Sequence, residues 1–352
     1  MSTACRLLVA VMLAGCGGGD PDQPAQSCVD PPALVAWERV ATTAAWSPRD
    51  SAAEYTHDGL LWIMGGWESS FEPNPRDVWS STDGRTWSLV AQQASWTHGD
   101  LAASASFAGR MWLLGGWANG RLPGASSSNE VWSSVDGLNW QSHGRAQWDA
   151  RLGAAAVAFK GRLWITGGVT AYFGGNAESL RNDVWSSEDG TQWTRATEHA
   201  PWSARAYHQL VVHGDRLYLM GGGNYLPQYA ANRDVWSSSD GISWRQESIA
   251  APWSARIWFS AVSYRGYLWV LGGWSNDPYR NWDDVWYSRD GQNWAVYNAG
   301  TQWSARHEQS VYVHEDALWV AGGFADPLTN DVWRLQLPAG WAGSCNAQGA
   351  RS

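Results

Sequence analysis

Residues 183–193 read DVWSSEDGTQW, and close copies of this stretch recur along the chain. The copies begin at Asp77, Glu130, Asp234 and Asp284, and a degraded copy begins at Asp331. In the full copies a short run of Val, Trp and Ser leads to Asp-Gly and a closing Trp, which is typical of two strands joined by a two-residue hairpin turn. Six occurrences of one phrase indicate a repeat architecture in which every unit shares one frame.

The rest of the unit repeats as well. A Trp-x-x-Arg phrase precedes an apolar run that ends in two glycines, and the leading Trp lies 19 residues before the first glycine in every unit, as Trp46 does before Gly65. Only the segment between the double glycine and the Asp or Glu varies, from 7 to 14 residues. Four short strands in about 50 residues resemble a kelch-type blade. The resemblance to the galactose oxidase/kelch superfamily implies an all-β, six-bladed propeller with four antiparallel strands per blade.

The chain order predicts how the ring closes. Trp37 lies 9 residues before Trp46, and the spacing from closing to leading Trp elsewhere is 8 or 9 residues, so residues 37–40 are predicted to form a fourth strand without its first three. The last unit supplies those three, through Leu335. We expect the N-terminal strand to complete the last blade, which removes the free sheet edges. Strand order also places the variable segments and the Trp-x-x-Arg phrases on one rim (the loop rim) and the tight turns on the other (the turn rim).

The N-terminus is typical of an export signal, with Arg6, an apolar run and then Leu13-Ala14-Gly15-Cys16. This ending resembles the bacterial lipoprotein lipobox, although an ordinary cleaved signal is an alternative. The lipobox resemblance implies a signal peptide at 1–15 and a lipid on Cys16. We expect a flexible tether at 16–33 from its composition, the propeller at 34–345 and a C-terminal tail at 346–352. We therefore expect an exported monomer that only a lipid anchors to the cell envelope, at the outer membrane or the cell surface.

Composition limits the partners. The formal charge is −9 and no block of Lys or Arg occurs, which disfavours nucleic-acid binding. The 29 Trp residues exceed what one ordinary core needs, and their place in every unit assigns most of them to packing between blades.

Five units carry an arginine in the Trp-x-x-Arg phrase, and two roles are open for it. In kelch domains that recognise proteins, arginines at this position contact acidic peptides, so the resemblance implies an anion-binding ring. The alternative is an ion pair with the Asp that starts strand three of the same unit. The second unit has Gly99 for the arginine and Glu130 for the aspartate, which favours the ion pair. The arginines are Arg49, Arg151, Arg205, Arg256 and Arg306.

Residues that break the repeat are the better candidates for binding. The variable segments are rich in aromatic side chains next to Asn and Asp, which suit sugar rings or protein hot spots. Residues specific to one unit at the start of strand one, Trp258 among them, join these at the loop rim. The candidate binding residues are Phe71, Trp117, Tyr172, Phe173, Tyr225, Tyr229, Trp274, Tyr279, Trp282, Phe324, His208, His307 and Glu308.

Catalytic and metal motifs are not recognisable in the sequence. The copper site of galactose oxidase requires a Cys crosslinked to a Tyr, and the two Cys that remain here lie at the chain ends, so we expect no cofactor and no copper chemistry. A metal site formed by His208, His307 and Glu308 is conceivable but lacks a spacing motif. The sequence therefore predicts a module that binds a glycan or a protein. The alternative is an isomerase or sialidase-like enzyme that acts on a sugar acid with the arginines and a Glu or His of the channel mouth.

Cys28 and Cys345 are predicted to form a disulfide, because an exported chain meets an oxidising compartment. The bond would close a loop of over 300 residues, for which chain entropy allows more than ~4 kcal/mol. Reduction should therefore lower the melting temperature of the mature protein. An unchanged melting temperature after confirmed reduction contradicts the bond.

Overall fold

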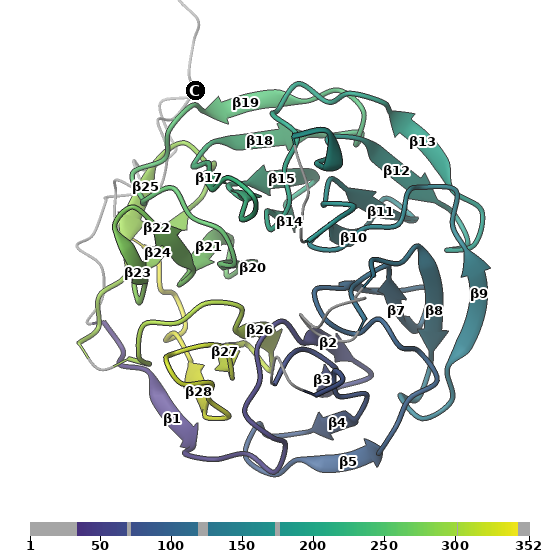
Figure 1. Ribbon diagram of the computed structural model, residues 1–352. Helices are drawn as coiled ribbons and strands as arrows, with labels where there is room; N and C mark the ends of the chain where they lie inside the picture. Colours follow the sequence, from purple (N-terminus) through teal and green to yellow (C-terminus); the bar gives the residue numbers. More distant parts are fainter. Residues whose placement is uncertain (1–33, 69–71, 119–125, 173–176, 301, 344–352) are drawn as a thin grey trace, which may run out of the picture.

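A computed structural model describes residues 34–343 apart from 69–71, 119–125, 173–176 and 301. Six four-stranded antiparallel sheets stand around a central axis as the blades of a β-propeller (Figure 1). The fold class expected from the repeats is confirmed. Cys16, Cys28, Cys345, Phe71 and Phe173 lie outside the described residues.

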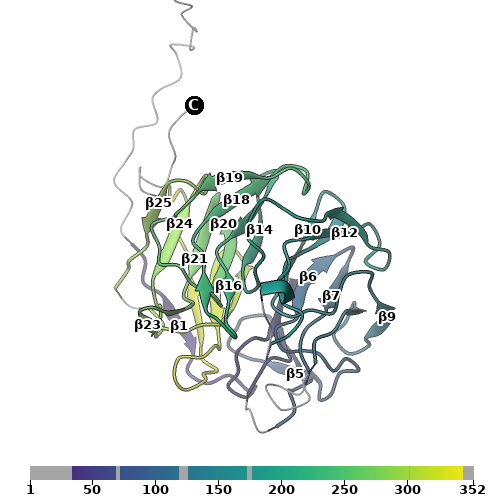
Figure 2. The same ribbon diagram turned by 45° about the horizontal axis from the view of Figure 1, so that its top comes forward.

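In each of the first five blades, the first strand lies innermost and the fourth lies outermost (Figures 1 and 2). Blade one comprises β2 (Ala53–His57), β3 (Leu60–Met64), β4 (Val78–Ser81) and β5 (Ser88–Ala91). Blade two comprises β6 (Ala103–Phe107), β7 (Arg110–Leu114), β8 (Glu130–Ser134) and β9 (Gln141–Arg145). Blade three comprises β10 (Ala155–Phe159), β11 (Arg162–Thr166), β12 (Val184–Ser187) and β13 (Thr194–Thr197).

The later blades follow the same order. Blade four comprises β14 (Gln209–His213), β15 (Arg216–Met220), β18 (Val235–Ser238) and β19 (Arg245–Ser248). Blade five comprises β20 (Ser260–Tyr264), β21 (Tyr267–Leu271), β24 (Val285–Ser288) and β25 (Trp294–Val296). Blade six comprises β26 (Ser310–His314), β27 (Ala317–Ala321), β28 (Val332–Leu335) and β1 (Glu38–Ala41).

The N-terminal strand closes the ring, as predicted. β1 pairs antiparallel with β28, with Glu38 opposite Arg334, and so forms the outer strand of the last blade. Every blade thereby has four strands, and no blade is left with an unpaired third strand.

The variable segments add little regular structure. Two of them form short hairpins and a third forms a single turn of 3-10 helix, η1. Among the described residues, no helix is long and apolar enough to cross a membrane. The elements are β16 (Gly223–Asn224), β17 (Ala230–Ala231), β22 (Trp274–Asn276), β23 (Tyr279–Asn281) and η1 (Ala177–Ser179).

The turn that carries the repeated Asp-Gly differs from the expected two-residue hairpin. Six residues separate β4 from β5, and the Asp83 carboxylate accepts the backbone N–H groups of Arg85 and Thr86 at 2.9 and 2.8 Å. The carboxylate itself satisfies the turn, so no strand pairing is needed across it. Gly84 has φ +65°, and a Cβ there would lie 2.4 Å from the Trp319 ring of blade six. The glycine thus permits both the turn and the contact between blades.

The leading and closing Trp of each blade form one edge-to-face pair. Trp46 lies 5.9 Å from Trp87 with an interplanar angle of 87°. Trp37, which precedes β1, makes the same pair with Trp303 at 6.1 Å and 81°. This geometry is favourable for aromatic rings and adds to the area that they bury. The other pairs are Trp96–Trp140, Trp148–Trp193, Trp202–Trp244 and Trp253–Trp294.

The arginines of the Trp-x-x-Arg phrases form ion pairs inside the blades. Arg151 donates from Nη1 to Asp183 Oδ1 at 2.6 Å and from Nη2 to Oδ2 at 2.9 Å. It also donates to the Gly167 carbonyl at the end of β11. The ion-pair alternative is thus confirmed, and the guanidinium groups do not line the surface of the loop rim because each side chain is at most 1% exposed. The other pairs are Arg49–Asp77, Arg205–Asp234, Arg256–Asp284 and Arg306–Asp331.

Replacing Arg151 with Met should reduce the free energy of unfolding by about 3–5 kcal/mol, because the Asp183 carboxylate would remain buried without its counter-ion. Urea unfolding measures the change. The matched control is Arg195→Met, since Arg195 pairs with Glu198 at the surface and should contribute less than about 1 kcal/mol. Equal losses in the two variants would contradict a special role for the internal pair.

Candidate functional site

A ring of backbone hydrogen bonds surrounds the central channel at the loop rim. The second residue after each Trp-x-x-Arg position has a positive φ, from 50° to 61°. At five of the six junctions between blades, the backbone N–H of this residue donates to the backbone carbonyl of the residue at the same position in the preceding blade. The bond from Ser51 N–H to Glu308 O, at 3.2 Å, joins blade one to blade six. We call this ring the collar; its residues are Ser51, Leu101, Gly153, Tyr207, Trp258 and Glu308.

A second set of backbone contacts places the variable segments beside the collar. The residue just before each collar residue forms a bridge with the residue just after the double glycine, as His307 does with Phe324 and Asp50 with Trp67. These register positions therefore direct side chains of all six blades to one opening, the channel mouth.

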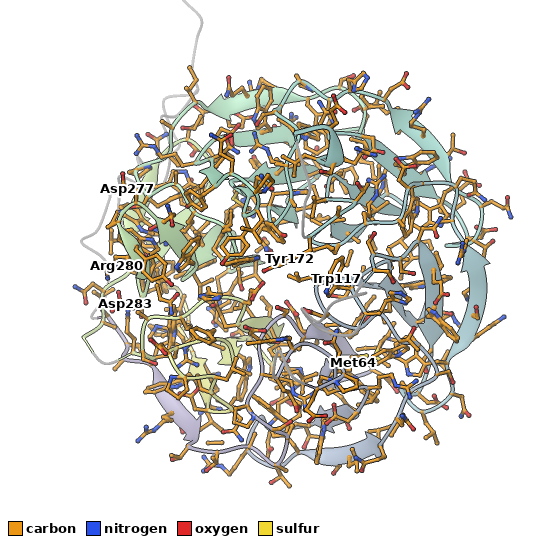
Figure 3. All side chains as sticks on the ribbon, in the orientation of Figure 1. Met64, Trp117, Tyr172, Asp277, Arg280 and Asp283 are labelled. Carbon is orange, nitrogen blue, oxygen red and sulfur yellow. The ribbon has the colours of Figure 1, made fainter. Side chains whose placement is uncertain are left out.

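Aromatic rings form a continuous arc around one side of the channel mouth. Successive centroids lie 4.6–5.9 Å apart, and Figure 3 shows Trp117 and Tyr172 beside the central opening. Trp274 adds to the arc through Tyr225 and Trp258. The arc, in order, is Trp117, Tyr172, Tyr225, Trp258, His307 and Phe324.

The arc borders a cavity of about 230 Å³, to which Trp67, Trp274, Tyr279 and Asp50 also contribute. Trp274 is 6% exposed, whereas Tyr279 at the edge of the cavity is 79% exposed. The candidate residues Trp117, Tyr172, Tyr225, Tyr229, Trp274 and Phe324 are thus brought together at the mouth. The mouth is a partly covered apolar surface with an exposed aromatic edge.

Trp282 has a different place. Its ring is covered by the guanidinium groups of Arg256 and Arg280, at 4.7 and 4.4 Å from the centroid. Arg280 lies at the outer edge of blade five, well away from the central opening (Figure 3). The cation–π contacts make Trp282 part of the blade edge, so the structure does not place it in the cavity.

Polar groups lie below the collar, in a second cavity of about 120 Å³ that His208, Glu54, Glu308 and Gln309 help to line. His208 bonds through Nε2 to Thr166 Oγ1 at 2.8 Å. Burial, assisted by the charge of Arg205, lowers the pKa of His208 to about 3, so this ring is neutral. His208 shares this cavity with Glu308, but among the described residues its ring nitrogens do not join the potential metal ligands around His307 and Glu308, so that combination of three does not form.

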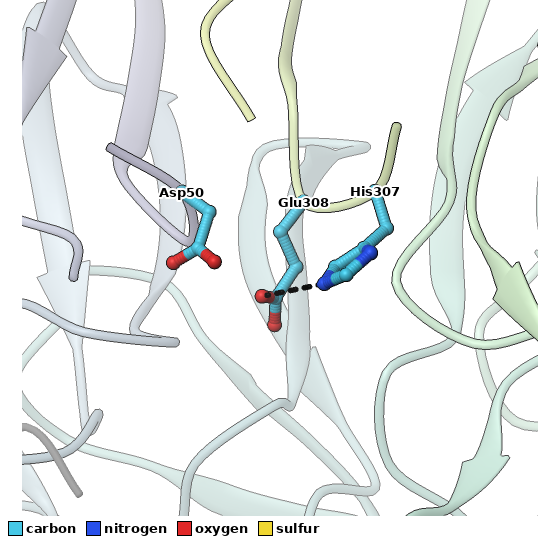
Figure 4. Close-up of side chains that lie close together, drawn as sticks. All are labelled: Asp50, His307 and Glu308. Atoms are coloured by element: carbon cyan, nitrogen blue, oxygen red, sulfur yellow. Dashed lines mark ion pairs between the residues drawn. The ribbon is translucent and has the colours of Figure 1, made fainter. Parts of the chain in front are cut away.

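A different combination does form. Asp50 takes the place of His208 beside His307 and Glu308, and their donor atoms lie within 4.8 Å of one another (Figure 4). This group is difficult to predict from the sequence, because Asp50 and His307 are far apart along the chain. Both residues directly follow the arginine of their blade, however, and this shared position in the repeat indicates that they lie on the same rim.

Three carboxyl groups face the two cavities. They belong to Asp50, Glu54 and Glu308, and none of the described residues that line the cavities is Lys or Arg. Sequence reasoning did not single out Glu54, which projects from the innermost strand β2.

Burial raises the pKa of Glu54 to about 8, although the backbone N–H groups of Glu54 and Val311 lower it in part. The folded protein therefore retains a proton that the unfolded chain releases near pH 4.5. The free energy of unfolding should fall as the pH rises between these two values.

Glu54→Gln should remove this slope, and denaturant unfolding between pH 5 and about 8 measures it in both proteins. His208 acts in the opposite direction, since its lowered pKa reduces stability as the pH falls below 6.5. Because His208 is present in both proteins, its contribution cancels when the slope of the variant is subtracted from that of the parent. An identical slope in both would contradict a protonated Glu54.

Comparisons with known proteins agree with this architecture. No family model matches the chain. Beta-scruin and alpha-scruin of Limulus polyphemus are 29% and 26% identical over 122 and 121 residues, which is 34% of this chain. The alignments span 13% of each scruin. The solved structure of YjhT superposes with a TM-score of 0.68 at 17% identity, covering 86% of this chain and 98% of that one. The repeats, the six closed blades and these similarities together identify the chain as a kelch-repeat β-propeller.

Proposed function

We propose that the protein is a binding module that holds a glycan or a partner protein at the channel mouth. The kelch propeller fold suggests an interaction module. The observation that carries the proposal is the aromatic arc with its cavity of about 230 Å³ and the exposed Tyr279 beside it. Rings in this arrangement can stack on the C–H faces of a sugar or receive an apolar anchor of a protein.

The charges near the channel mouth limit the class of ligand. Each of the five repeated arginines forms an ion pair with the aspartate of its own blade, so these arginines do not bind an anionic ligand. The carboxyl groups of Asp50 and Glu308 at the cavities disfavour an anionic ligand and leave a neutral or cationic ligand favoured. The enzyme hypothesis requires an arginine that receives a sugar acid, and this geometry gives it less support.

The proposed location is the bacterial cell envelope. The lipobox-like ending at Cys16 supports export and attachment through a lipid. Metabolic labelling with a palmitate analogue tests it in a bacterial host, with Cys16→Ala as the unlabelled control.

Tyr279→Ala should reduce the affinity for a glycan found on an array by about tenfold, because it removes the exposed ring from the cavity edge. Calorimetry with the selected glycan measures the change. Leu138→Ala is the matched control, since Leu138 is also exposed but lies on the turn rim, and its affinity should remain that of the parent.

Equal affinity of both variants would contradict binding at the mouth. If the array is empty, pull-down of a protein partner with the same two variants tests the second ligand class. Turnover of a sugar acid that Glu308→Gln abolishes would instead favour the enzyme.

A further inference from the structure

Three potential metal ligands meet where the ring closes. Asp50 precedes β2 of blade one, whereas His307 and Glu308 precede β26 of blade six. One ligand atom from each lies within 4.8 Å of the others, and Figure 4 shows the two carboxylates and the imidazole directed toward a common region. The bond from Ser51 N–H to Glu308 O fixes the two segments next to each other.

The His307 ring is held in one orientation. Asn281 donates from Nδ2 to the Phe324 carbonyl at 2.9 Å, so its Oδ1 must be the atom 2.6 Å from His307 Nδ1. An amide oxygen only accepts, and Nδ1 therefore carries the hydrogen. This leaves Nε2, which lies 3.8 Å from Glu308 Oε2, as the basic nitrogen of the neutral ring. A metal-ligating histidine usually donates its other ring N–H to an oxygen acceptor, and the Asn281 amide oxygen is such an acceptor here.

Packing fixes the ring further. Trp258 stacks on it at 5.1 Å with an interplanar angle of 22°, and Phe324 does so at 5.2 Å and 28°. The two rings restrict the plane of the imidazole, and the hydrogen bond from Nδ1 to Asn281 determines which nitrogen faces the carboxylates. A ligand with this much support is preorganised, so little entropy is lost when a cation binds.

Charge completes the argument. The Asp50 residue is 1% exposed and the Glu308 side chain 3% exposed. If both groups are ionised they repel each other at this distance, and a cation between them and the imidazole replaces that repulsion with attraction. One imidazole nitrogen and two carboxylate oxygens form a donor set that suits zinc or manganese.

We propose that Asp50, His307 and Glu308 form a divalent metal site, with zinc as the preferred ion. Donors at about 2.1 Å from one tetrahedral ion lie about 3.4 Å apart, so the most distant of these atoms must approach each other by up to about 1.4 Å. Tetrahedral zinc with three protein ligands keeps a fourth position for water or a ligand donor. Asp50 and His307 also line the aromatic cavity, so that position belongs to the channel mouth. The proposal does not depend on the identity of the glycan or protein ligand.

The test is calorimetry of the full chain, stripped with chelator, with zinc chloride and in parallel with manganese chloride. We expect one zinc ion per chain. Asp50→Asn and His307→Ala should each weaken zinc binding by about 100-fold, and Asn281→Ala, which only releases the ring, by about 10- to 100-fold. His199→Ala is the matched control, because His199 also bonds through Nδ1 to an asparagine, Asn182, but is exposed. It should bind zinc as the parent does.

Folding is checked by circular dichroism without zinc, and Asp50→Asn preserves the shape of the side chain if His307→Ala fails to fold. Two outcomes overturn the proposal. One is no saturable binding of zinc or manganese by the stripped parent protein. The other is unchanged affinity in folded Asp50→Asn, which would place the bound ion elsewhere.

Discussion

The ion pair between the arginine of Trp-x-x-Arg and the aspartate at the start of strand three is the constraint on which the loop rim depends. In blade three, the Arg151 guanidinium binds the Asp183 carboxylate, the carbonyl of Gly167 and the carbonyl of Asp149. One side chain thus connects the entry to strand one, the exit of strand two and the entry to strand three. Burial alone would raise the pKa of the Asp183 carboxyl, but the hydrogen bonds and charge of Arg151 hold that pKa below its ordinary value. The residues just beyond the arginine and the glycines are therefore held at the channel mouth in every blade with the pair.

Blade two shows what replaces the pair. Gly99 stands in the arginine position, and a Cβ there would lie 2.4 Å from the Trp96 ring. His98 approaches the Glu130 carboxylate at 3.9 Å, and Trp132 donates to the same carboxylate. The collar continues through Leu101 nevertheless. The propeller consequently accommodates the weaker His98–Glu130 contact in blade two, because the other five blades retain the Arg–Asp ion pair.

The repeated parts of the molecule could be predicted from sequence because each is specified six times. The blade number, the strand count and the role of the strand beginning near Trp37 all followed from spacing, and the ion pairs were one of two stated alternatives. The turn at Asp83 was predicted incorrectly, because the carboxylate replaces the strand hydrogen bonds that define a two-residue hairpin. The site was harder to predict. Trp282 is an aromatic residue of a variable segment, as several residues of the arc are, yet cation–π contacts hold it at the blade edge. Asp50 was not recognised because its neighbours in space come from the other end of the chain.

The pairing of β1 with β28 has a consequence for biosynthesis. The ribosome produces the strand near Trp37 first, but that strand obtains its partner only after β28 has emerged. Until then, a row of backbone donors and acceptors is exposed, and it could pair with the edge of another chain. A nascent polypeptide with this topology therefore benefits from a holding chaperone until its last blade is made. Any aggregation during synthesis should involve this first strand rather than the five locally formed blades.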